Sequence, residues 1–309
     1  MVRTALPHGR ILEISPLTEG LRNSNFKIGL DRAPYWSVLR IYEHDATLCQ
    51  KELDLMRFVS ASVPVPEVIH AEPQGLDDLP PFMLRFYVEG ITFMELRRGG
   101  DSDAIAQAAY SAGQTLAAIG GFSFPKPGWL APGPAVSAAL LEGDDPAPRF
   151  VDLCLASGNL QRRMPSDLHD RAHTLVWSYA ARLASLTAET SLVHGDYNKR
   201  NVVVRETAGR WSVAAVLDWE FAVSGSPLAD IANFVRYERA AHPRAEPHFS
   251  SGYVQAGGSL PADWRYLAKV LDLVALCESL TRDDLPDSVG AELVELVQAT
   301  VENRDPQFN

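Results

Sequence analysis

The character of the sequence changes near residue 90, and this change constrains the fold more than any other feature. Before it, short runs rich in β-branched and aromatic residues alternate with turn residues, at residues 11–14, 26–30, 36–42 and 82–88. After it, apolar residues recur at helical spacing. Strands followed by helices predict an α+β protein. Because 309 residues exceed what one small core needs, we expect two lobes, residues 1–88 and 89–309.

The helices are expected where apolar residues recur every three or four positions. These segments are residues 46–60, 103–119, 168–188, 228–241, 262–281 and 286–302. Residues 121–148 are rich in glycine and proline, which favour turns, so we expect an irregular excursion there. The second lobe is therefore predicted to be mainly helical.

The most informative segment of the second lobe is a predicted β-hairpin over residues 202–217, with its turn in residues 205–210. Asn201 enters the first strand and Asp218 leaves the second, so antiparallel pairing places both at the open end. Asp196 precedes Asn201 on the same loop. Two carboxylates and an amide oxygen then converge, and hard oxygen donors suit Mg²⁺. The alternative is a plain hairpin that uses Asp and Asn as turn formers.

The residues around this hairpin resemble a known signature. The stretch runs His194-Gly195-Asp196, then four residues, then Asn201, and the second strand ends in Leu217-Asp218-Trp219-Glu220. This pattern looks like that of the aminoglycoside phosphotransferase family, which belongs to the protein-kinase-like superfamily together with choline-kinase-like enzymes. The resemblance implies a two-lobe kinase-like fold, with a small β-rich N-terminal lobe and a larger helical lobe.

The resemblance also implies roles for individual residues. Asp196 would be the catalytic aspartate, and Asn201 and Asp218 would bind Mg²⁺ beside ATP or GTP. His194 would support the loop structurally instead of acting as an acid or base. Asp230 would be a structural brace at a helix start, where the helix dipole favours a carboxylate.

The first lobe offers a cation and a carboxylate for the phosphates. Val38, Arg40 and Tyr42 share one face of a strand because side chains alternate. Glu52 lies on the apolar stripe of the next helix, where a carboxylate is costly unless it is paired. We therefore expect an Arg40–Glu52 pair, although the superfamily has Lys at this strand position. Lys27 and Lys51 are the alternative cations, but Lys51 neighbours Glu52 on the helix and cannot share its face.

Two further segments are expected to contact the nucleotide. The polar loop over residues 18–25, with Ser24 and Asn25, would cover the phosphates, unless it is an ordinary hairpin loop. Residues 85–88, including Phe86 and Tyr87, would form a hinge whose backbone hydrogen-bonds the purine. Backbone contacts leave little trace in side chains, so ATP and GTP both remain open.

The acceptor is expected to be a small hydroxylated molecule, because the short segment from Asp218 to Pro227 leaves no room for a peptide platform. Glu238 and Glu278 are candidates for binding an acceptor amine. The net charge of −11 suits a cationic acceptor such as an aminoglycoside antibiotic. The alternatives are a metabolite kinase for choline-like, sugar or amino-alcohol acceptors, and a nucleotide-binding pseudokinase.

Composition excludes several other classes of protein. The acidic charge disfavours nucleic-acid binding. The start of the chain lacks the apolar core of a signal peptide, and no apolar stretch reaches the roughly 18 residues of a membrane span. The cysteines Cys49, Cys154 and Cys277 are widely spaced, which favours reduced thiols and a cytoplasmic location.

Overall fold

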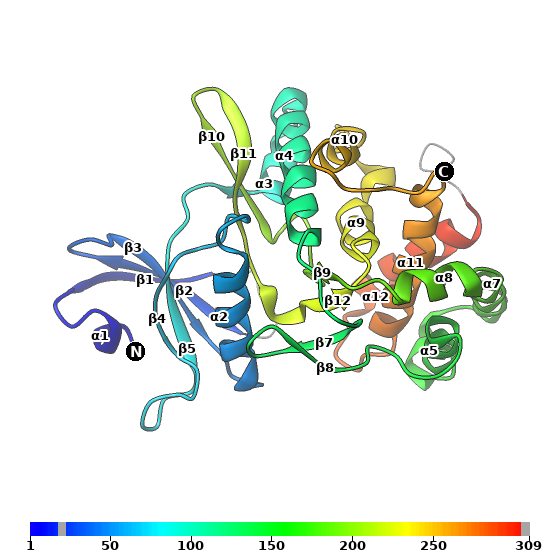
Figure 1. Ribbon diagram of the computed structural model, residues 1–309, viewed down its shortest axis with the longest axis horizontal. Coiled ribbons are helices and arrows are strands. Elements are labelled where there is room, and N and C mark those ends of the chain that lie inside the picture. The colour runs from blue at the N-terminus through cyan, green and yellow to red at the C-terminus, as the bar shows by residue number, and fades with distance from the viewer. Residues whose placement is uncertain (18–22, 304–309) are drawn as a thin grey trace.

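The computed structural model describes residues 1–17 and 23–303. An antiparallel sheet lies at one end of the molecule and a larger, mainly helical part lies at the other (Figure 1). The N-terminus lies beside the sheet, and the last helix described, residues 287–301, lies in the helical part. The predicted α+β, two-lobe architecture is thus confirmed, while the boundary at residue 88 stays a prediction.

The sheet of the N-terminal lobe has the strand order β1-β2-β3-β5-β4, and all of its neighbours are antiparallel. Its strands are β1 (Ile11–Leu17), β2 (Ser24–Leu30), β3 (Trp36–Ile41), β4 (Val68–Glu72) and β5 (Phe82–Phe86). Four of them are predicted from their β-forming residues. β4 is not, because it is a half-buried edge strand that carries polar residues along its length.

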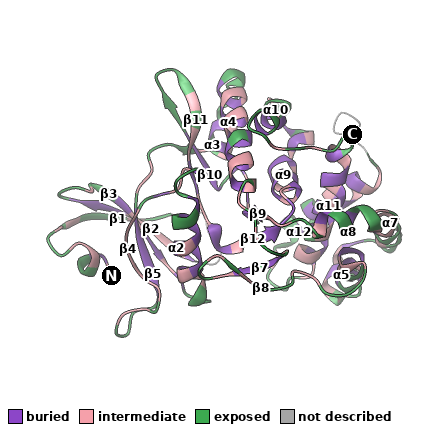
Figure 2. Ribbon diagram, in the orientation of Figure 1, coloured by how far each residue is buried: buried purple, intermediate pink, exposed green. Residues whose placement is uncertain are grey.

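The two faces of this sheet pack differently. One face holds a small apolar cluster that includes Ile28, Leu39 and Leu84, partly covered by the short helix α1 (Val2–Ala5). The other face receives α2 (Thr47–Val59), and the apolar residues of this helix belong to the large core that continues through the helical lobe. Figure 2 shows buried residues both in α2 and in the helices of the other lobe. Charged side chains near α2 are therefore enclosed between the lobes.

The chain enters the C-terminal lobe through β6 (Ile91–Thr92) and α3 (Phe93–Gly99), which begins with a capping box formed by Thr92 and Glu95. The long helix α4 (Ser102–Gly120) follows, as predicted, and Asp101 caps it by accepting from the backbone N–H groups of its first turn. Two side chains of α4 also bind the strand β11 (Arg210–Val216): Gln107 accepts from the Trp211 N–H and Ser111 from the Val213 N–H.

Helix α4 crosses α10 (His248–Gln255) at two glycines. A Cβ on Gly113 would lie 2.0 Å from the Phe249 carbonyl oxygen, and a Cβ on Gly252 would lie 2.0 Å from that of Tyr110. The two backbones therefore touch at a distance that only glycine permits. Next to this crossing, the Tyr197 hydroxyl donates to the Ala112 carbonyl oxygen at 2.8 Å.

Two further sheets lie in the C-terminal lobe, with strand orders β11-β10-β6 and β8-β7-β12-β9. Their remaining strands are β7 (Gly128–Ala131), β8 (Ala135–Ala138), β9 (Ser191–Val193), β10 (Val202–Thr207) and β12 (Val223–Gly225). The prediction of an irregular excursion over residues 121–148 is therefore wrong in part. Its strand β7 pairs with β12, and a partner so distant in sequence cannot be seen in local composition.

The other helices are α5 (Pro146–Leu155), α6 (Gly158–Arg163), α7 (Ser166–Ser178), α8 (Ala180–Thr187), α9 (Leu228–Val235), α11 (Trp264–Leu280) and α12 (Asp287–Val301), with 3₁₀ turns η1 (Trp219–Phe221) and η2 (Glu238–Ala240). α5, α6 and α10 are not predicted, and the expected helix over residues 168–188 divides at Tyr179. Within the described ranges, every helix is too short or too polar to cross a membrane.

Candidate active site

The β10–β11 hairpin brings the predicted metal-binding residues together. Val202 pairs with Val216, and the Leu217 N–H donates to the Asn201 carbonyl oxygen at 2.8 Å. Asn201 and Asp218 therefore lie at the same open end of the hairpin, as the sequence predicts. Asp218 has a φ of 61° and ends the strand in a left-handed conformation that leads directly into η1.

The loop of residues 194–201 is fixed to α9 by Asp230. The Asp230 carboxylate accepts from the backbone N–H groups of His194, at 2.6 Å, and of Gly195, at 2.9 Å. Gly195 has a φ of +81°, and a Cβ there would lie 2.2 Å from the Phe221 carbonyl oxygen, so this turn requires glycine. Burial raises the pKa of Asp230 to about 7, although these backbone donors act to lower it. Asp230, the structural brace expected at the start of α9, thus holds the loop of residues 194–201 in place.

His194 connects this loop to the end of β11. Its Nε2 lies 2.9 Å from the Leu217 carbonyl oxygen, and its Nδ1 accepts from the Asp196 N–H at 3.2 Å. The ring is therefore a neutral tautomer protonated at Nε2. Burial lowers the pKa of His194 to about 4. A buried, neutral ring with both nitrogens occupied has the geometry of a structural support.

Asp196 is surrounded by amide donors. Its Oδ1 accepts from Asn198 at 2.7 Å and from Asn233 at 3.3 Å, and its Oδ2 accepts from Asn201 at 2.8 Å. Burial raises the pKa of Asp196, and the nearby charge of Asp218 raises it further, while the three amides act to lower it. This carboxylate is therefore a better proton acceptor than an exposed aspartate.

Asn198 and Asn233 are missing from the residues predicted from the sequence. Asn233 follows Asp230 by three positions on α9, so the two share a helix face. That spacing is a signal that could identify Asn233 once Asp230 is known to face the loop.

Arg40 joins the two lobes. Its Nε lies 3.1 Å from Glu52 on α2, its Nη1 lies 2.5 Å from Asp218, and its Nη2 lies 3.4 Å from Glu220. Burial would lower the pKa of Arg40, but the carboxylates around it, led by Glu52, raise it above the ordinary value. The predicted Arg40–Glu52 ion pair is thus present, and it extends to the hairpin end that carries Asp218.

Glu52 is fully buried and receives more than one donor. Arg85 lies 3.3 Å from its Oε1, and the Tyr42 hydroxyl donates to its Oε2 at 2.5 Å. These partners compensate the cost of burying its charge. Arg85 and Glu220 complete the cluster, and sequence reasoning did not assign either of them to it.

The two alternative cations have other partners. Lys27 lies over the rings of Trp36, at 4.5 Å, and Tyr87, at 3.9 Å from their centroids. Lys51 is buried and donates to the Glu220 carbonyl oxygen at 2.8 Å. Burial lowers the pKa of Lys51 to about 8. Of the three candidate cations, Arg40 is therefore the one that meets Glu52.

The predicted phosphate loop is described only in part, because residues 18–22 lie outside the described residues. Ser24 donates to Glu43 at 2.8 Å on the exposed side of β2, and Asn25 donates to the Asn23 carbonyl oxygen at 3.4 Å. Asn23 in turn donates to Glu220 at 2.8 Å. The base of the loop thus contacts the carboxylate that also meets Arg40.

The predicted hinge follows β5. The Phe86 N–H donates to the Glu67 carbonyl oxygen at 2.9 Å, and the Tyr87 N–H donates to the Trp36 carbonyl oxygen at 3.3 Å. Both donors are therefore used inside the lobe and do not point toward a purine. The Phe86 side chain is 39% exposed, so it stays accessible to a ligand.

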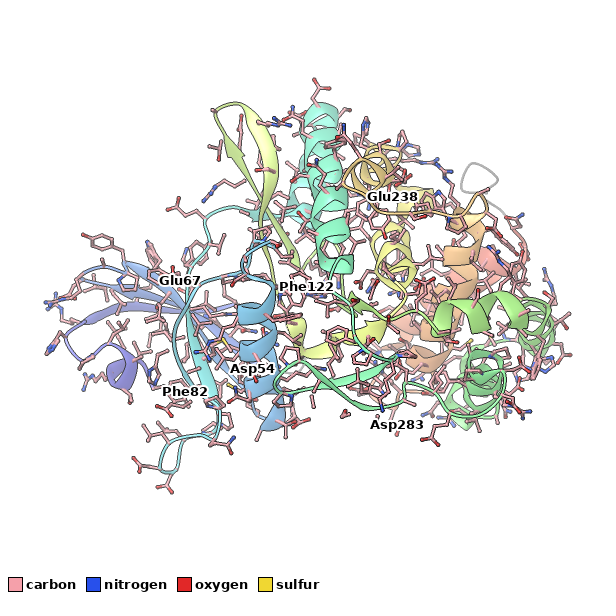
Figure 3. The ribbon with its side chains drawn as sticks, viewed as in Figure 1. Asp54, Glu67, Phe82, Phe122, Glu238 and Asp283 are labelled. Carbon is pink, nitrogen blue, oxygen red and sulfur yellow. The ribbon has the colours of Figure 1, made fainter. Side chains whose placement is uncertain are left out.

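The structure does not bring the two predicted acceptor-binding residues to an open surface beside Asp196. Glu238 is fully buried between α9 and α10 (Figure 3), where it pairs with Lys199 at 3.0 Å and Arg97 at 3.3 Å. Glu278 lies near the end of α11 and pairs with Arg282 one helical turn away. Helical spacing indicated the helix face on which Glu278 lies, and Glu238 was chosen because it follows the helix of Asp230, but neither pattern shows which groups surround these carboxylates.

The donors at the hairpin end fit Mg²⁺. Asn201 turns its amide nitrogen toward Asp196, so its carbonyl oxygen points the other way, and Asp218 supplies a carboxylate. In the part of the chain that the structure describes, no group of three His, Cys, Asp or Glu side chains could hold a metal. Mg²⁺ needs no such group, since one or two protein oxygens and substrate phosphates suffice.

Comparisons with solved structures find the same fold. A thermostable mutant of aminoglycoside phosphotransferase APH(4)-Ia, in ternary complex with AMP-PNP and hygromycin B, superimposes with a TM-score of 0.68 at 18% identity, covering 97% of this chain and 96% of that chain. The GDP and kanamycin complex of APH(2")-IIIa superimposes with a TM-score of 0.70 at 18% identity, covering 98% and 97%. At this level of identity the likeness concerns the fold.

Curated proteins match over short segments only. Acyl-CoA dehydrogenase family member 11 of Homo sapiens is 35% identical over 74 residues, which are 24% of this chain and 9% of that protein. The Gallus gallus protein of the same name is 48% identical over 44 residues, 14% of this chain and 5% of that protein. The chain therefore spans less than a tenth of these relatives, and their dehydrogenase activity is not transferred to it.

A sequence model of one family covers most of the chain. The phosphotransferase enzyme family matches residues 13–270, a range that includes the cluster around Arg40, the loop with Asp196 and the β10–β11 hairpin. Together with the kinase-like fold, this match shows that the chain is a member of the phosphotransferase enzyme family.

Proposed function

We propose that the protein is a small-molecule kinase that transfers the γ-phosphoryl group of ATP or GTP to a hydroxyl of a small acceptor with the help of Mg²⁺. One observation carries the proposal: Asp196, Asn201 and Asp218 meet at the end of the β10–β11 hairpin, next to Arg40. Phosphoryl transfer requires this combination of a carboxylate for the acceptor, oxygen ligands for the metal and a cation for the phosphates.

Each residue then has a defined task. The acceptor hydroxyl donates a hydrogen bond to Asp196, whose amide partners hold the carboxylate in position for an in-line attack. Asn201 and Asp218 would hold Mg²⁺, which neutralises the charge on the phosphates. Arg40, positioned by Glu52, would contact the phosphates, and it would then exchange its bond to Asp218 for bonds to the nucleotide.

The rest of the proposed nucleotide site uses the two segments that the sequence indicates. The loop with Ser24 and Asn25 would cover the phosphates. The segment with Phe86 and Tyr87 would contact the base through the exposed side chain of Phe86, because the backbone N–H groups of both residues already have partners within the lobe. We also propose a cytoplasmic enzyme without nucleic-acid or membrane partners, which the charge of −11 and the three buried free cysteines support.

Two classes of acceptor are candidates. Aminoglycosides are expected from the sequence, and the similar structures above hold hygromycin B and kanamycin. A metabolite with a hydroxyl group is the second candidate. It is favoured by the burial of Glu238 between Lys199 and Arg97, which leaves this carboxylate no space for an ammonium group. The intact set of Asp196, Asn201 and Asp218 argues against a pseudokinase.

The test is an ADP-release assay with ATP and GTP over a panel of acceptors. Asp196→Ala should abolish acceptor phosphorylation, a loss of about 10³-fold or more, while nucleotide binding stays within several-fold of wild type. Arg205→Ala, on an exposed position of β10, is the matched control and should keep full activity. Normal turnover of Asp196→Ala would end the assignment.

A further inference from the structure

A pocket separate from the candidate active site lies where α4, α10 and β11 meet, and Figure 1 shows α4 between the other two elements. Its volume is about 410 Å³, within the range of roughly 300–1,000 Å³ that is usual for cavities that bind small organic molecules. Arg210 and Trp211, at the start of β11, line it. About 20 Å of extended strand lies between Arg210 and Val216, next to the open end of the hairpin. The pocket is therefore a second site.

The walls of this pocket are fixed to one another. The Gly113–Gly252 crossing holds α10 against α4, and His248, which lines the pocket, lies one helical turn before Gly252. Gln107 and Ser111 hold α4 on the edge of β11, because their side-chain oxygens accept from two backbone N–H groups of that strand. The cavity therefore exists before a ligand enters, so binding does not need to order its walls.

Aromatic rings form part of the lining. Trp211 packs against the large core and also lines the pocket, and Tyr110 lines it from α4. Aromatic side chains pack well against other flat rings, in stacked or edge-on arrangements. This part of the pocket suits a ring.

Three side chains around β11 have hydrogen-bond donors left for a ligand. The Oε1 of Gln107 accepts from the Trp211 N–H at 3.0 Å, so the amide NH₂ of Gln107 remains. The hydroxyl of Ser111 accepts from the Val213 N–H at 3.0 Å, so its proton remains. Within the described ranges, the Arg210 guanidinium has no carboxylate or carbonyl partner. These donors need a ligand that carries acceptor oxygens.

The charge of the lining favours an anion. Arg210 is always charged, and its planar group binds both oxygens of a carboxylate or phosphate at once. His248 adds a second nitrogen base, and no Asp or Glu among the described residues lines the pocket. Two carboxylates lie close outside it: Asp103 on α4 and Glu206 on β10, which pairs with Trp211 across the hairpin. Both are exposed, so water screens them.

We infer that this pocket binds a small aromatic or heteroaromatic molecule that carries a carboxylate or a phosphate group. The anionic oxygens bind the Arg210 guanidinium, and Gln107 and Ser111 donate to oxygens of the same molecule. The ring packs against Trp211 and Tyr110. The inference goes beyond the proposed kinase reaction and does not depend on it, since binding is measured without turnover.

The first experiment measures binding to the purified full chain by isothermal titration calorimetry. Phenylacetate and phenyl phosphate are the anionic aromatic probes. Phenethyl alcohol is the neutral match, phenethylamine the cationic match, and acetate and inorganic phosphate are the matches without a ring. The tighter aromatic anion should bind at least about tenfold more tightly than each match, and the two anions together distinguish a carboxylate ligand from a phosphate ligand.

Two results of this titration overturn the inference. One is equal or tighter binding of a neutral, cationic or ringless match. The other is a lack of binding of both aromatic anions at concentrations up to about 10 mM.

The second experiment removes the charge of the pocket. Arg210→Ala should raise the Kd of the tighter aromatic anion by about tenfold or more. Arg57→Ala is the matched control, because Arg57 is also exposed and lies in the last turn of α2, in the other lobe. It should leave this Kd within about twofold of wild type. An unchanged Kd in Arg210→Ala, or the same loss in Arg57→Ala, contradicts the inference.

The third experiment changes a donor into an acceptor. Gln107→Glu keeps an oxygen for the Trp211 N–H but replaces the remaining amide NH₂ by a second carboxylate oxygen. The Kd of the aromatic anion should rise about tenfold or more, while Tm stays within about 2 °C of wild type. Gln74→Glu, which adds the same charge at an exposed position between β4 and β5, is the control. Unchanged affinity in Gln107→Glu, or an equal loss in Gln74→Glu, overturns the inference.

Discussion

The two sides of the candidate site are held by different kinds of interaction. On the sheet side, Arg40 and Arg85 meet Glu52, and Arg40 continues to Asp218 across the lobes. On the loop side, neutral amides surround Asp196, and backbone N–H groups bind Asp230. Buried ion pairs depend strongly on every partner, because one lost charge leaves another uncompensated. Amide hydrogen bonds also orient a carboxylate, but the loss of one of them costs less free energy of unfolding than the loss of a buried charge.

This difference has a functional meaning in the proposed reaction. Asp218 belongs to both sides, since it is bound to Arg40 here and would bind Mg²⁺ with the nucleotide. Nucleotide binding must therefore rearrange the charged side, while the amide-held carboxylate of Asp196 can stay where it is. Variants that change residues on one side only should therefore separate the rearrangement of the ion pairs from the positioning of Asp196.

The largest effect on stability is expected on the charged side. Glu52→Gln removes the buried carboxylate and leaves Arg40 and Arg85 without their shared partner. The loss should cost about 3–5 kcal/mol of the free energy of unfolding, measured by urea denaturation. Glu43→Gln changes an exposed carboxylate that accepts from Ser24. It is the control and should change the free energy of unfolding by less than about 1 kcal/mol. Equal losses of unfolding free energy in Glu52→Gln and Glu43→Gln would contradict the strong dependence of the buried cluster on each of its charges.

On the loop side, Asp230 should make the stability of the protein depend on pH. The folded-state pKa of Asp230 is raised from 3.8 to about 7, so between these values the folded protein binds a proton that the unfolded chain does not. Its contribution to stability is therefore complete below pH 4 and is lost as the pH rises to 7. Asp230→Asn lacks this dependence, so its destabilisation relative to wild type should be larger at pH 5 than at pH 8, by about 2–3 kcal/mol.

The measurement for this brace is urea denaturation of both proteins at the two pH values. Asp287→Asn serves as the control, because Asp287 also lies in the first turn of a helix, α12, but is exposed. The difference in destabilisation between pH 5 and pH 8 should be larger for Asp230→Asn than for Asp287→Asn. A penalty for Asp230→Asn that grows toward pH 8 would contradict the burial argument.

The smallest effect concerns one amide beside Asp196. Asn233→Ala removes a hydrogen bond that lowers the pKa of Asp196, so this pKa should rise. Because the reaction uses the ionised carboxylate, the acidic limb of the kcat/KM profile should move to higher pH. Activity should fall by about three- to tenfold at the acidic end and less at high pH. Asn159→Ala, on α6, is the control. A uniform loss at all pH values would assign Asn233 another role.

Much of the candidate site can be predicted from the sequence where the interacting residues lie close together along the chain. The hairpin places Asn201 and Asp218 by strand pairing alone, and strand and helix periodicity places Arg40 opposite Glu52. The contact of Arg40 with Asp218 joins residues 178 positions apart, and only the relative placement of the two lobes creates it. Local patterns do not contain that information.

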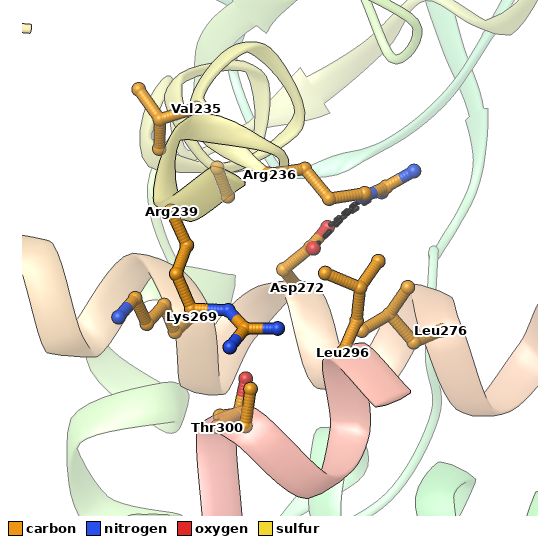
Figure 4. A pocket seen from close by; sticks show the side chains of 10 residues that line it. Val235, Arg236, Arg239, Lys269, Asp272, Leu276, Leu296 and Thr300 are labelled. Atoms are coloured by element: carbon orange, nitrogen blue, oxygen red, sulfur yellow. Dashed lines mark hydrogen bonds and ion pairs between the residues drawn. The ribbon is translucent and has the colours of Figure 1, made fainter. Parts of the chain in front are cut away.

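The errors have the same physical origin. Glu238 was expected to meet an acceptor because it follows a helix near the site, yet Lys199 and Arg97 enclose it. A small pocket between α9, α11 and α12, lined by residues that include Ala232, Leu276 and Leu296 (Figure 4), depends on the packing of three helices, so no single segment predicts it. Sequence patterns thus identify the chemistry of the transferred group better than the identity of the acceptor.

The glycine crossing of α4 and α10 connects the packing of two helices to the candidate active site. Any side chain at Gly113 or Gly252 would force the two backbones apart, and Ala112, which receives the Tyr197 hydroxyl, would move with α4. The strain would thus reach the loop that carries Asp196. A substitution at either glycine should therefore disturb the position of Asp196, although neither glycine lies in the candidate active site.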